Sequence, residues 1–285
     1  MSSTTTPGGS LRGPHTSIVR TATASGEVDV TVLAYDNTSE GPAKTFLLLH
    51  GGGGPGTMAG FAALLAGETR TRVLLPTHPG FTGTPRPTGL ASTGDLAGLY
   101  VALLDELDAT EVTLVGNSFG GWLAAEIALL GSDRVSNAVI VDGVGVRVDG
   151  HPPTDVRGLA PQELQKLSWH DPSKAQRPPA GGGSGPSPDL TALFAYTGPD
   201  MADPTLGQRL GTLDLEVHVI WGESDGIVDT GFGKAFADAI PQATFTVLPC
   251  AGHLPQLETP EALLGTLLGL IERDPSYPPT ARAVR

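Results

Sequence analysis

The chain has 285 residues, 39% hydrophobic and 16% charged, which allows a substantial buried core and argues against global disorder. Its 30 acidic and 17 basic side chains give a formal net charge of −13, which would repel the phosphates of a nucleic-acid partner. No apolar run reaches the roughly 18–20 residues needed to cross a bilayer, and the single cysteine excludes an internal disulfide and a multi-cysteine metal site.

The first residues, 1–15, are rich in Ser, Thr, Pro and Gly and lack the apolar core of a secretory signal. We therefore expect a flexible tail and a cytoplasmic protein. Residues 16–35 follow it with a pattern typical of an antiparallel hairpin that turns at Ser25-Gly26 and adds to one edge of a sheet.

Six short apolar runs then predict buried strands, at residues 45–49, 72–75, 111–115, 137–141, 216–221 and 243–248. Helical patterns occupy residues 93–107, 120–130 and 259–274. Strands rich in Val, Ile and Leu that alternate with helices indicate a mostly parallel central sheet with helices on both faces, which is an α/β fold.

The alternation of strands and helices breaks between the sixth and seventh strands of the predicted sheet. We predict a cap inserted there, at residues 146–212, with residues 16–145 and 213–285 forming the core. The cap contains a helical pattern at 160–169 and a Pro-, Gly- and Ser-rich run at 171–189 that we expect to be a mobile loop.

The segment "GNSFG" at 116–120 follows a predicted strand and precedes a predicted helix, as a nucleophile elbow requires. Its glycines allow a sharp turn that projects Ser118, and the helix start directs amides at developing negative charge. Alternatively, Ser118 is only the N-cap of that helix. The histidine, acid and glycine motifs described below favour the interpretation of Ser118 as a nucleophile.

A serine hydroxyl needs a base, and the chain has seven histidines. We predict that the base is His253, in the loop after the last strand, where Ala251-Gly252 allow close approach. His50 and His78 follow strands and are expected near the site. The remaining four are expected in the tail, in the cap or inside a strand: His15, His151, His170 and His218.

An acid must orient the base, and Asp225 best matches a position beyond the carboxyl end of the seventh strand. Glu223 is the reserve candidate, and Asp142, at the end of the preceding strand, is a further alternative. The chain order Ser118, Asp225, His253 is the one expected of an α/β-hydrolase arrangement.

Consecutive glycines in "HGGGGPG" at 50–56 follow an early strand, and they allow backbone amides to approach an oxyanion. We predict that the amides of Gly52 and Phe119 form this oxyanion hole, and that Gly51, Gly53 and Asn117 contact the substrate. A phosphate-binding loop is the alternative, but neither a following Lys-Ser/Thr pair nor a GxGxxG spacing supports it.

The motifs "HGGGGPG", "PTHPGFTGTPRP", "GNSFGG", "WGESDGIV" and "AGHLPQLETPEAL" together resemble the α/β-hydrolase superfamily, from about residue 27 to 273. The resemblance implies a serine hydrolase whose helical cap selects the substrate. Two of the motifs are similar to those of meta-cleavage-product hydrolases, which cut carbon–carbon bonds. That group usually has a tryptophan beside the histidine, where this chain has Leu254, and a basic cap residue, for which Arg157, Arg177 and Arg209 are available.

We therefore predict a cofactor-independent, metal-free hydrolase of a small or medium-sized ester, thioester or lactone. Carbon–carbon bond hydrolysis and a ligand-binding protein with a retained triad stay open as alternatives. The expected partner is a small-molecule substrate, with no nucleic acid and no membrane span, and the protein is expected to be a monomer or a homodimer.

Overall fold

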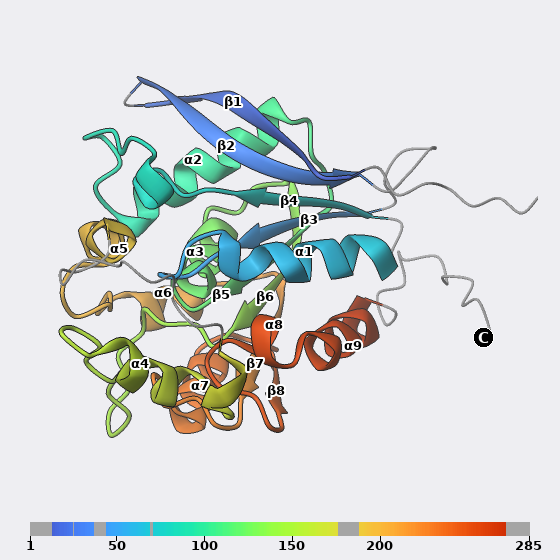
Figure 1. Ribbon diagram of the computed structural model, residues 1–285. Coiled ribbons are helices and arrows are strands. Elements are labelled where there is room, and N and C mark those ends of the chain that lie inside the picture. Colours follow the sequence, from blue (N-terminus) through green and yellow to red (C-terminus); the bar gives the residue numbers. More distant parts are fainter. Residues whose placement is uncertain (1–12, 25, 37–43, 69–70, 176–187, 272–285) are drawn as a thin grey trace, which may run out of the picture.

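A computed structural model describes residues 13–24, 26–36, 44–68, 71–175 and 188–271 (Figure 1). Within these residues an eight-stranded sheet has the order β1-β2-β4-β3-β5-β6-β7-β8. The strands are β1 His15–Thr23, β2 Gly26–Asp36, β3 Lys44–Leu49, β4 Thr71–Pro76, β5 Val112–Asn117, β6 Val135–Val141, β7 Glu216–Gly222 and β8 Thr244–Leu248. Strand β2 pairs antiparallel with β1 and β4, and all other neighbours are parallel. The predicted α/β fold with an edge hairpin is confirmed.

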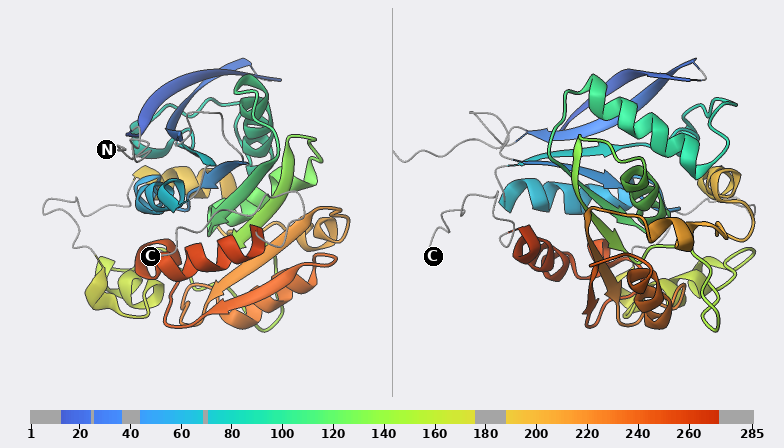
Figure 2. Two further views of the ribbon diagram at one scale, coloured as in Figure 1. Left: turned by 90° about the vertical axis from the view of Figure 1, so that its right-hand side faces the viewer. Right: turned by 180° about the vertical axis from the view of Figure 1, so that it is seen from behind.

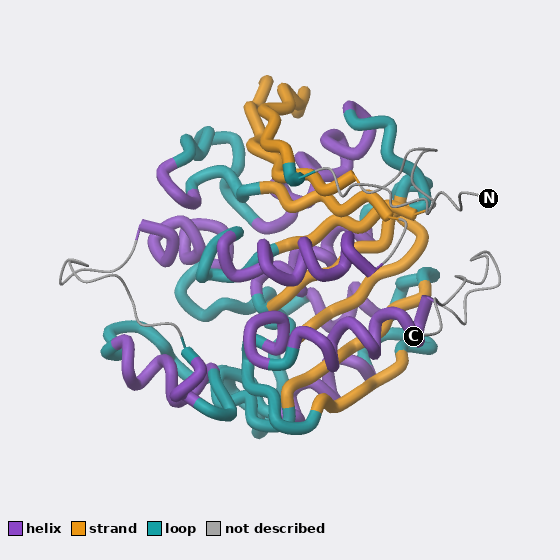
Figure 3. The backbone as a smooth tube through the Cα atoms, turned by 45° about the vertical axis from the view of Figure 1, so that its right-hand side comes forward, coloured by secondary structure: helices purple, strands orange, loops and turns teal. Residues whose placement is uncertain are grey.

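Helices cover both faces of the sheet, with α1 and α9 on one face and α2, α3 and α7 on the other (Figures 1, 2 and 3). The helices are α1 Gly56–Glu68, α2 Thr93–Glu106, α3 Phe119–Leu129, α4 Pro161–Ser168, α5 Pro188–Thr197, α6 Leu206–Leu210, α7 Thr230–Asp238, α8 Pro255–Glu258 and α9 Pro260–Ile271. Two 3-10 turns, η1 Phe81–Gly83 and η2 Pro172–Lys174, complete the described elements.

Strand β3 explains why the central strands are apolar without alternation. Its Leu47 and Leu49 belong to the apolar cluster on the α2 and α3 face, whereas Phe46 and Leu48 belong to the cluster on the α1 and α9 face. Consecutive side chains of a strand point to opposite faces, so a strand covered on both faces must be apolar throughout.

The carboxyl ends of the six parallel strands meet at one edge of the sheet, where ligands bind in open α/β folds. The segment between β6 and β7, which contains α4, α5 and α6, lies at this edge (Figures 1 and 2). We keep 146–212 as the predicted extent of the cap. Leu206 and Leu210 of α6 are themselves part of the core cluster on the α3 face.

Three details differ from the sequence-based expectations. His15 starts strand β1, where it pairs with Ala34 instead of lying in a tail. Helix α5 begins at Pro188, inside the run expected to be a loop, of which residues 176–187 lie outside the described residues. The helix predicted at 259–274 starts at Pro260, because a residue before proline is disfavoured in a helical conformation; its residues 272–274 are not described.

Candidate active site

The turn between β5 and α3 carries Ser118 in a strained conformation, with φ 57° and ψ −118°. Such a backbone costs of order 1–3 kcal/mol and persists only where its surroundings enforce it. The surroundings are close-packed backbone. A Cβ on Gly116 would lie 2.0 Å from the carbonyl oxygen of Gly120, and a Cβ on Gly120 would lie 2.0 Å from that of Leu49. The glycines therefore let strand, turn and helix approach closely enough to project the serine.

Ser118 occupies the N-cap position of α3, but its hydroxyl makes no capping hydrogen bond. Its Oγ lies 2.9 Å from Nε2 of His253, and Nδ1 of His253 lies 2.7 Å from Oδ2 of Asp225. All three residues are buried. The structure thus brings together the hydroxyl, imidazole and carboxylate that the sequence analysis selected, although 107 and 28 residues separate them along the chain (118 to 225, 225 to 253).

Asp225 and Glu223 have different partners. The second carboxylate oxygen of Asp225 accepts the backbone amide of Ile227 at 2.8 Å, which fixes the side chain toward His253. Glu223 is exposed and accepts the amide of Cys250 at 3.2 Å. Of these two candidates, only Asp225 contacts the imidazole in the described residues.

Asp142, the further alternative, follows β6 and is completely buried. Its Oδ1 accepts the amide of Gly222 at 2.7 Å, while its Oδ2 has no hydrogen-bond donor among the described residues. Burial, and then the negative charge of Asp225, raise the pKa of Asp142 well above its ordinary value. The raised pKa favours the protonated form of Asp142.

The glycine loop after β3 packs directly against the serine. A Cβ on Gly51 would lie 3.0 Å from Cβ of Ser118, and Gly51, Gly52 and Gly53 all line the cavity beside it. Phe119 is the first residue of α3, so its amide is one of those left without an intrahelical partner at a helix start. The two predicted oxyanion donors thus belong to segments that flank Ser118.

His50 and His78 are buried behind this loop and do not line the cavity. Nδ1 of His50 lies 2.8 Å from the carbonyl oxygen of Gly51, and its Nε2 accepts the amide of His78 at 3.1 Å. Nε2 of His78 lies 2.9 Å from the carbonyl oxygen of His50, and Nδ1 lies 2.5 Å from the hydroxyl of Tyr100. Burial lowers the pKa of His50 to about 4. Burial, and then the influence of His50, also lower the pKa of His78 well below its ordinary value. Both rings are neutral supports of the glycine loop.

Asn117 lies at the cavity, but its amide hydrogen bonds hold the histidine loop. Its Nδ2 donates to the carbonyl oxygen of His253 at 2.9 Å, and its Oδ1 accepts from Nε2 of Gln256 at 3.0 Å. A direct substrate contact through the Asn117 side chain stays a prediction. Gln256 was not selected from the sequence.

Glu258 is a second buried residue that the sequence analysis did not select. Its carboxylate accepts the amides of Gly252 and His170, each at 2.9 Å. The amide of His253 donates to the carbonyl oxygen of Ser168 at 2.9 Å. The end of α4 is therefore fastened to the loop that carries the imidazole. No local pattern marks Glu258, because His170 lies 88 residues away along the chain.

A cavity of about 170 Å³ opens beside Ser118 and His253. Aliphatic side chains from the segment between β6 and β7 form much of its wall: Val156, Leu164, Leu190, Leu193 and Met201. No lysine, arginine, aspartate or glutamate of the described residues lines it.

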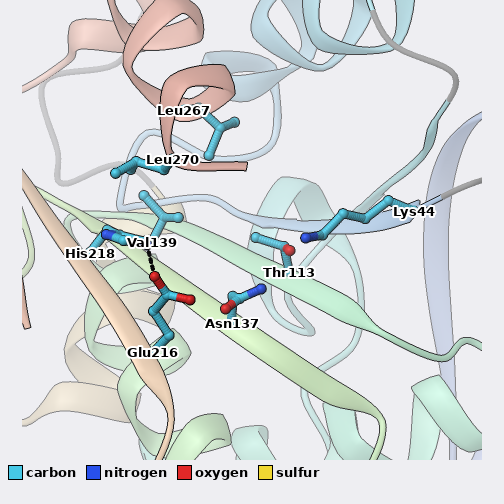
Figure 4. Close-up of a pocket in the computed structure, with 8 residues that line it drawn as sticks. All are labelled: Lys44, Thr113, Asn137, Val139, Glu216, His218, Leu267 and Leu270. Atoms are coloured by element: carbon cyan, nitrogen blue, oxygen red, sulfur yellow. Dashed lines mark ion pairs between the residues drawn. The ribbon is translucent and has the colours of Figure 1, made fainter. Parts of the chain in front are cut away.

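The remaining histidines have other partners. His151 contacts Asp229, His170 contacts Ser224, and His15 is exposed. His218 lies 2.6 Å from the hydroxyl of Thr244, beside a cavity of about 10 Å³ under the amino ends of the central strands (Figure 4). This cavity is also lined by Lys44 and is too small for a substrate.

The described residues contain no cluster of three His, Cys, Asp or Glu side chains arranged to hold a metal ion. In the same part of the chain, no helix has the length and apolar character of a membrane span.

The strand order and the strained serine turn place the protein among the α/β hydrolases. The chain belongs to the Alpha/beta hydrolase family, whose profile matches residues 46–266. It is 24% identical over 268 residues to 2-hydroxy-6-oxononadienedioate/2-hydroxy-6-oxononatrienedioate hydrolase 1 of Pseudomonas putida, covering 82% of this chain and 89% of that protein.

Solved structures agree on the fold. The meta-cleavage product hydrolase of Pseudomonas fluorescens has a TM-score of 0.67 at 22% identity, covering 90% of this chain and 98% of its own. A thermophilic esterase of Thermogutta terrifontis has a TM-score of 0.63 at 21% identity, covering 91% of this chain and 98% of its own. At these identities the likeness shows the fold alone.

Proposed function

We propose that the protein is a cofactor-independent serine hydrolase of a small or medium-sized ester, thioester or lactone. The observation that supports this most is the hydrogen-bonded series from Ser118 through His253 to Asp225, at 2.9 and 2.7 Å. The imidazole removes the hydroxyl proton of Ser118, which makes the serine oxygen nucleophilic. The carboxylate fixes the tautomer of the imidazole and stabilises the imidazolium.

In the acylation step, Oγ of Ser118 attacks the carbonyl carbon while Nε2 of His253 takes the hydroxyl proton. The carbonyl electron pair moves to oxygen, and the amides of Gly52 and Phe119 hold this oxyanion. As the pair returns, the bond to the leaving group breaks and His253 gives the leaving alkoxide or thiolate its proton. An acyl-Ser118 ester remains.

In the deacylation step, His253 takes a proton from a water molecule, whose oxygen attacks the acyl carbon. The bond between carbon and Oγ breaks, Ser118 recovers its proton from His253, and the carboxylic acid leaves. Gly51, Gly53 and Asn117, which line the cavity, contact the substrate in this proposal.

The test uses the purified full chain with p-nitrophenyl acetate and a fluorophosphonate probe. We expect labelling of the wild type, no labelling of Ser118→Ala, and a loss of kcat of at least about a thousandfold in that variant. Ser132→Ala, on the loop after α3, is the matched control and should label normally. A folded wild-type protein that neither labels nor turns over would favour a ligand-binding protein instead.

A second candidate is hydrolysis of a carbon–carbon bond, which the relatives favour. The Pseudomonas putida relative is named for a dienedioate, and the Pseudomonas fluorescens structure is a meta-cleavage product hydrolase. Comparing kcat/KM for a coloured dienoate and for simple esters separates the two proposals. A clear preference for the dienoate would make carbon–carbon hydrolysis the primary activity.

A further inference from the structure

We infer that the site selects substrates whose group beside Ser118 is neutral and apolar, and that Leu190 and Leu193 of α5 impose this selectivity. The inference rests on the proposed hydrolase function and adds the class of substrate. It follows from the wall of the cavity, the pairing of the arginines in the segment between β6 and β7, and the way α5 is fixed.

Among the described residues, the wall offers a carboxylate no lysine or arginine side chain. The cavity beside Ser118 holds about 170 Å³, below the roughly 300–1,000 Å³ typical of sites for larger ligands, and aliphatic side chains surround much of it. A carboxylate that enters such a space loses its hydration and gains no cation in exchange. A methyl or methylene group gains burial there instead.

The arginines that the structure describes between residues 146 and 212 are already paired with carboxylates. The pairs are Arg147–Asp200 at 3.2 Å, Arg157–Asp155 at 2.8 Å, Arg209–Glu126 at 2.6 Å and Arg209–Asp203 at 2.7 Å. None of these arginines lines the cavity. Arg177, the remaining candidate for gripping a substrate carboxylate, lies outside the described residues.

Helix α5 is fastened to the loops of the core, so its leucines form a fixed wall. Asp189 accepts the amide of Thr82 at 2.7 Å, and the hydroxyl of Tyr196 donates to the carbonyl oxygen of Pro79 at 2.9 Å. A Cβ on Gly52 would lie 2.9 Å from Cδ2 of Leu193, so this leucine packs directly on the proposed oxyanion loop. A substrate held by that loop must meet Leu193.

The experiment compares two p-nitrophenyl esters of equal chain length, the hexanoate and the hemiadipate, in which a carboxylate replaces the terminal methyl group. Both are assayed with the full chain in 0.5 M NaCl, which screens the repulsion that a net charge of −13 exerts on any anion. We expect kcat/KM for the hexanoate to exceed that for the hemiadipate by about a hundredfold.

Leu193→Arg supplies the missing cation and should shift the kcat/KM ratio toward the hemiadipate by at least about tenfold. Leu193→Met, of similar volume and without charge, should keep the wild-type preference. If Leu193→Arg does not fold, Leu164→Arg on the half-buried face of α4 makes the same test at another part of the wall.

Equal kcat/KM for the two esters, or a preference for the hemiadipate, in Ser118-dependent turnover would overturn the inference and leave the hydrolase function standing. Absence of both Ser118-dependent turnover and fluorophosphonate labelling would instead overturn the proposed function. The two failures are therefore distinguishable.

Discussion

Asp142 and Asp225 follow the neighbouring strands β6 and β7 and are both buried, and burial together with the charge of Asp225 raises the pKa of Asp142. Asp225 uses its oxygens on His253 and on backbone amides. Asp142 accepts one amide, from Gly222, and is left with an oxygen that meets no donor in the described residues. Protonation of Asp142, which its raised pKa favours, would remove the repulsion between the two carboxylates.

The first prediction concerns the pH dependence of stability. The unfolded chain loses the Asp142 proton near pH 3.8, whereas the folded chain keeps it because its pKa is raised. Folding then binds a proton, so the free energy of unfolding falls as pH rises above 3.8, by up to about 1.4 kcal/mol per pH unit. Asp142→Asn retains a donor for Asp225 without this cost.

Urea denaturation at pH 4, 5.5 and 7 measures this effect. The stability of Asp142→Asn relative to the wild type should increase steadily across the series. Asp133→Asn, an exposed change after α3, should differ from the wild type by the same few tenths of a kcal/mol at each pH. A pH-independent difference for Asp142→Asn would mean that Asp142 is ionised in the folded protein.

The second prediction separates the two acids after β7. Asp225→Asn should lower kcat for an ester by at least about a hundredfold, since the imidazole loses the carboxylate that fixes its tautomer. Glu223→Gln should retain activity within about threefold, because Glu223 is exposed and binds only a backbone amide. Steady-state kinetics on both purified variants test this, and the reverse order of effects would assign the acid to Glu223.

The third prediction follows from the neutral histidines behind the glycine loop. His50 has a pKa lowered to about 4 by burial, and that of His78 is lowered as well, whereas unfolded histidines titrate near 6.5. Between pH 6.5 and 4 the unfolded chain binds more protons, so these two groups make the free energy of unfolding fall as pH falls.

Removing one of these two histidines should reduce the pH dependence of the free energy of unfolding. His78→Phe is expected to be less stable at pH 7, since it loses the hydrogen bonds to His50 and Tyr100. Its free energy of unfolding should, however, change less steeply with pH than that of the wild type, by an amount that corresponds to up to one proton fewer taken up on unfolding. His15→Gln, an exposed change on β1, should keep most of the wild-type slope. Denaturation curves at pH 7, 6 and 5 measure the free energy of unfolding of each variant. An identical pH dependence for His78→Phe and the wild type would contradict the assignment of His78 as neutral in the folded protein.

The fourth prediction concerns the serine turn. Gly120→Ala puts a methyl group 2.0 Å from the carbonyl oxygen of Leu49, so the backbone of Leu49 and His50 must move to admit it. We expect a loss of several kcal/mol in the free energy of unfolding, together with most of any turnover of p-nitrophenyl acetate. Gly98→Ala in α2 is the matched control, since its new methyl group meets no atom within 4 Å.

For Gly98→Ala the helix propensity of alanine should add up to about 1 kcal/mol to the free energy of unfolding. Thermal melts and p-nitrophenyl acetate kinetics on both variants make the comparison. Wild-type activity in Gly120→Ala would show that the turn tolerates a side chain and that close packing does not enforce the Ser118 conformation.

Local pattern was enough to predict the central strands and the helices α2, α3 and α9. A strand covered on both faces must be apolar, and β3, β5 and β7 carry that pattern in a few consecutive residues. Helix α7 was missed, although Asp229 caps it with a 2.8 Å bond to the amide of Phe232. The helix has only nine residues, so its apolar pattern is weak.

The sequence by itself determined the α/β fold and pointed to Ser118, His253 and Asp225, because nearby glycines and strand ends mark where such side chains occur. Tertiary structure decided which acid meets the imidazole, what Asp142 and Glu258 contact, and which leucines wall the cavity. Those contacts join segments tens to more than a hundred residues apart, and their energy depends on burial and distance, which local sequence does not encode.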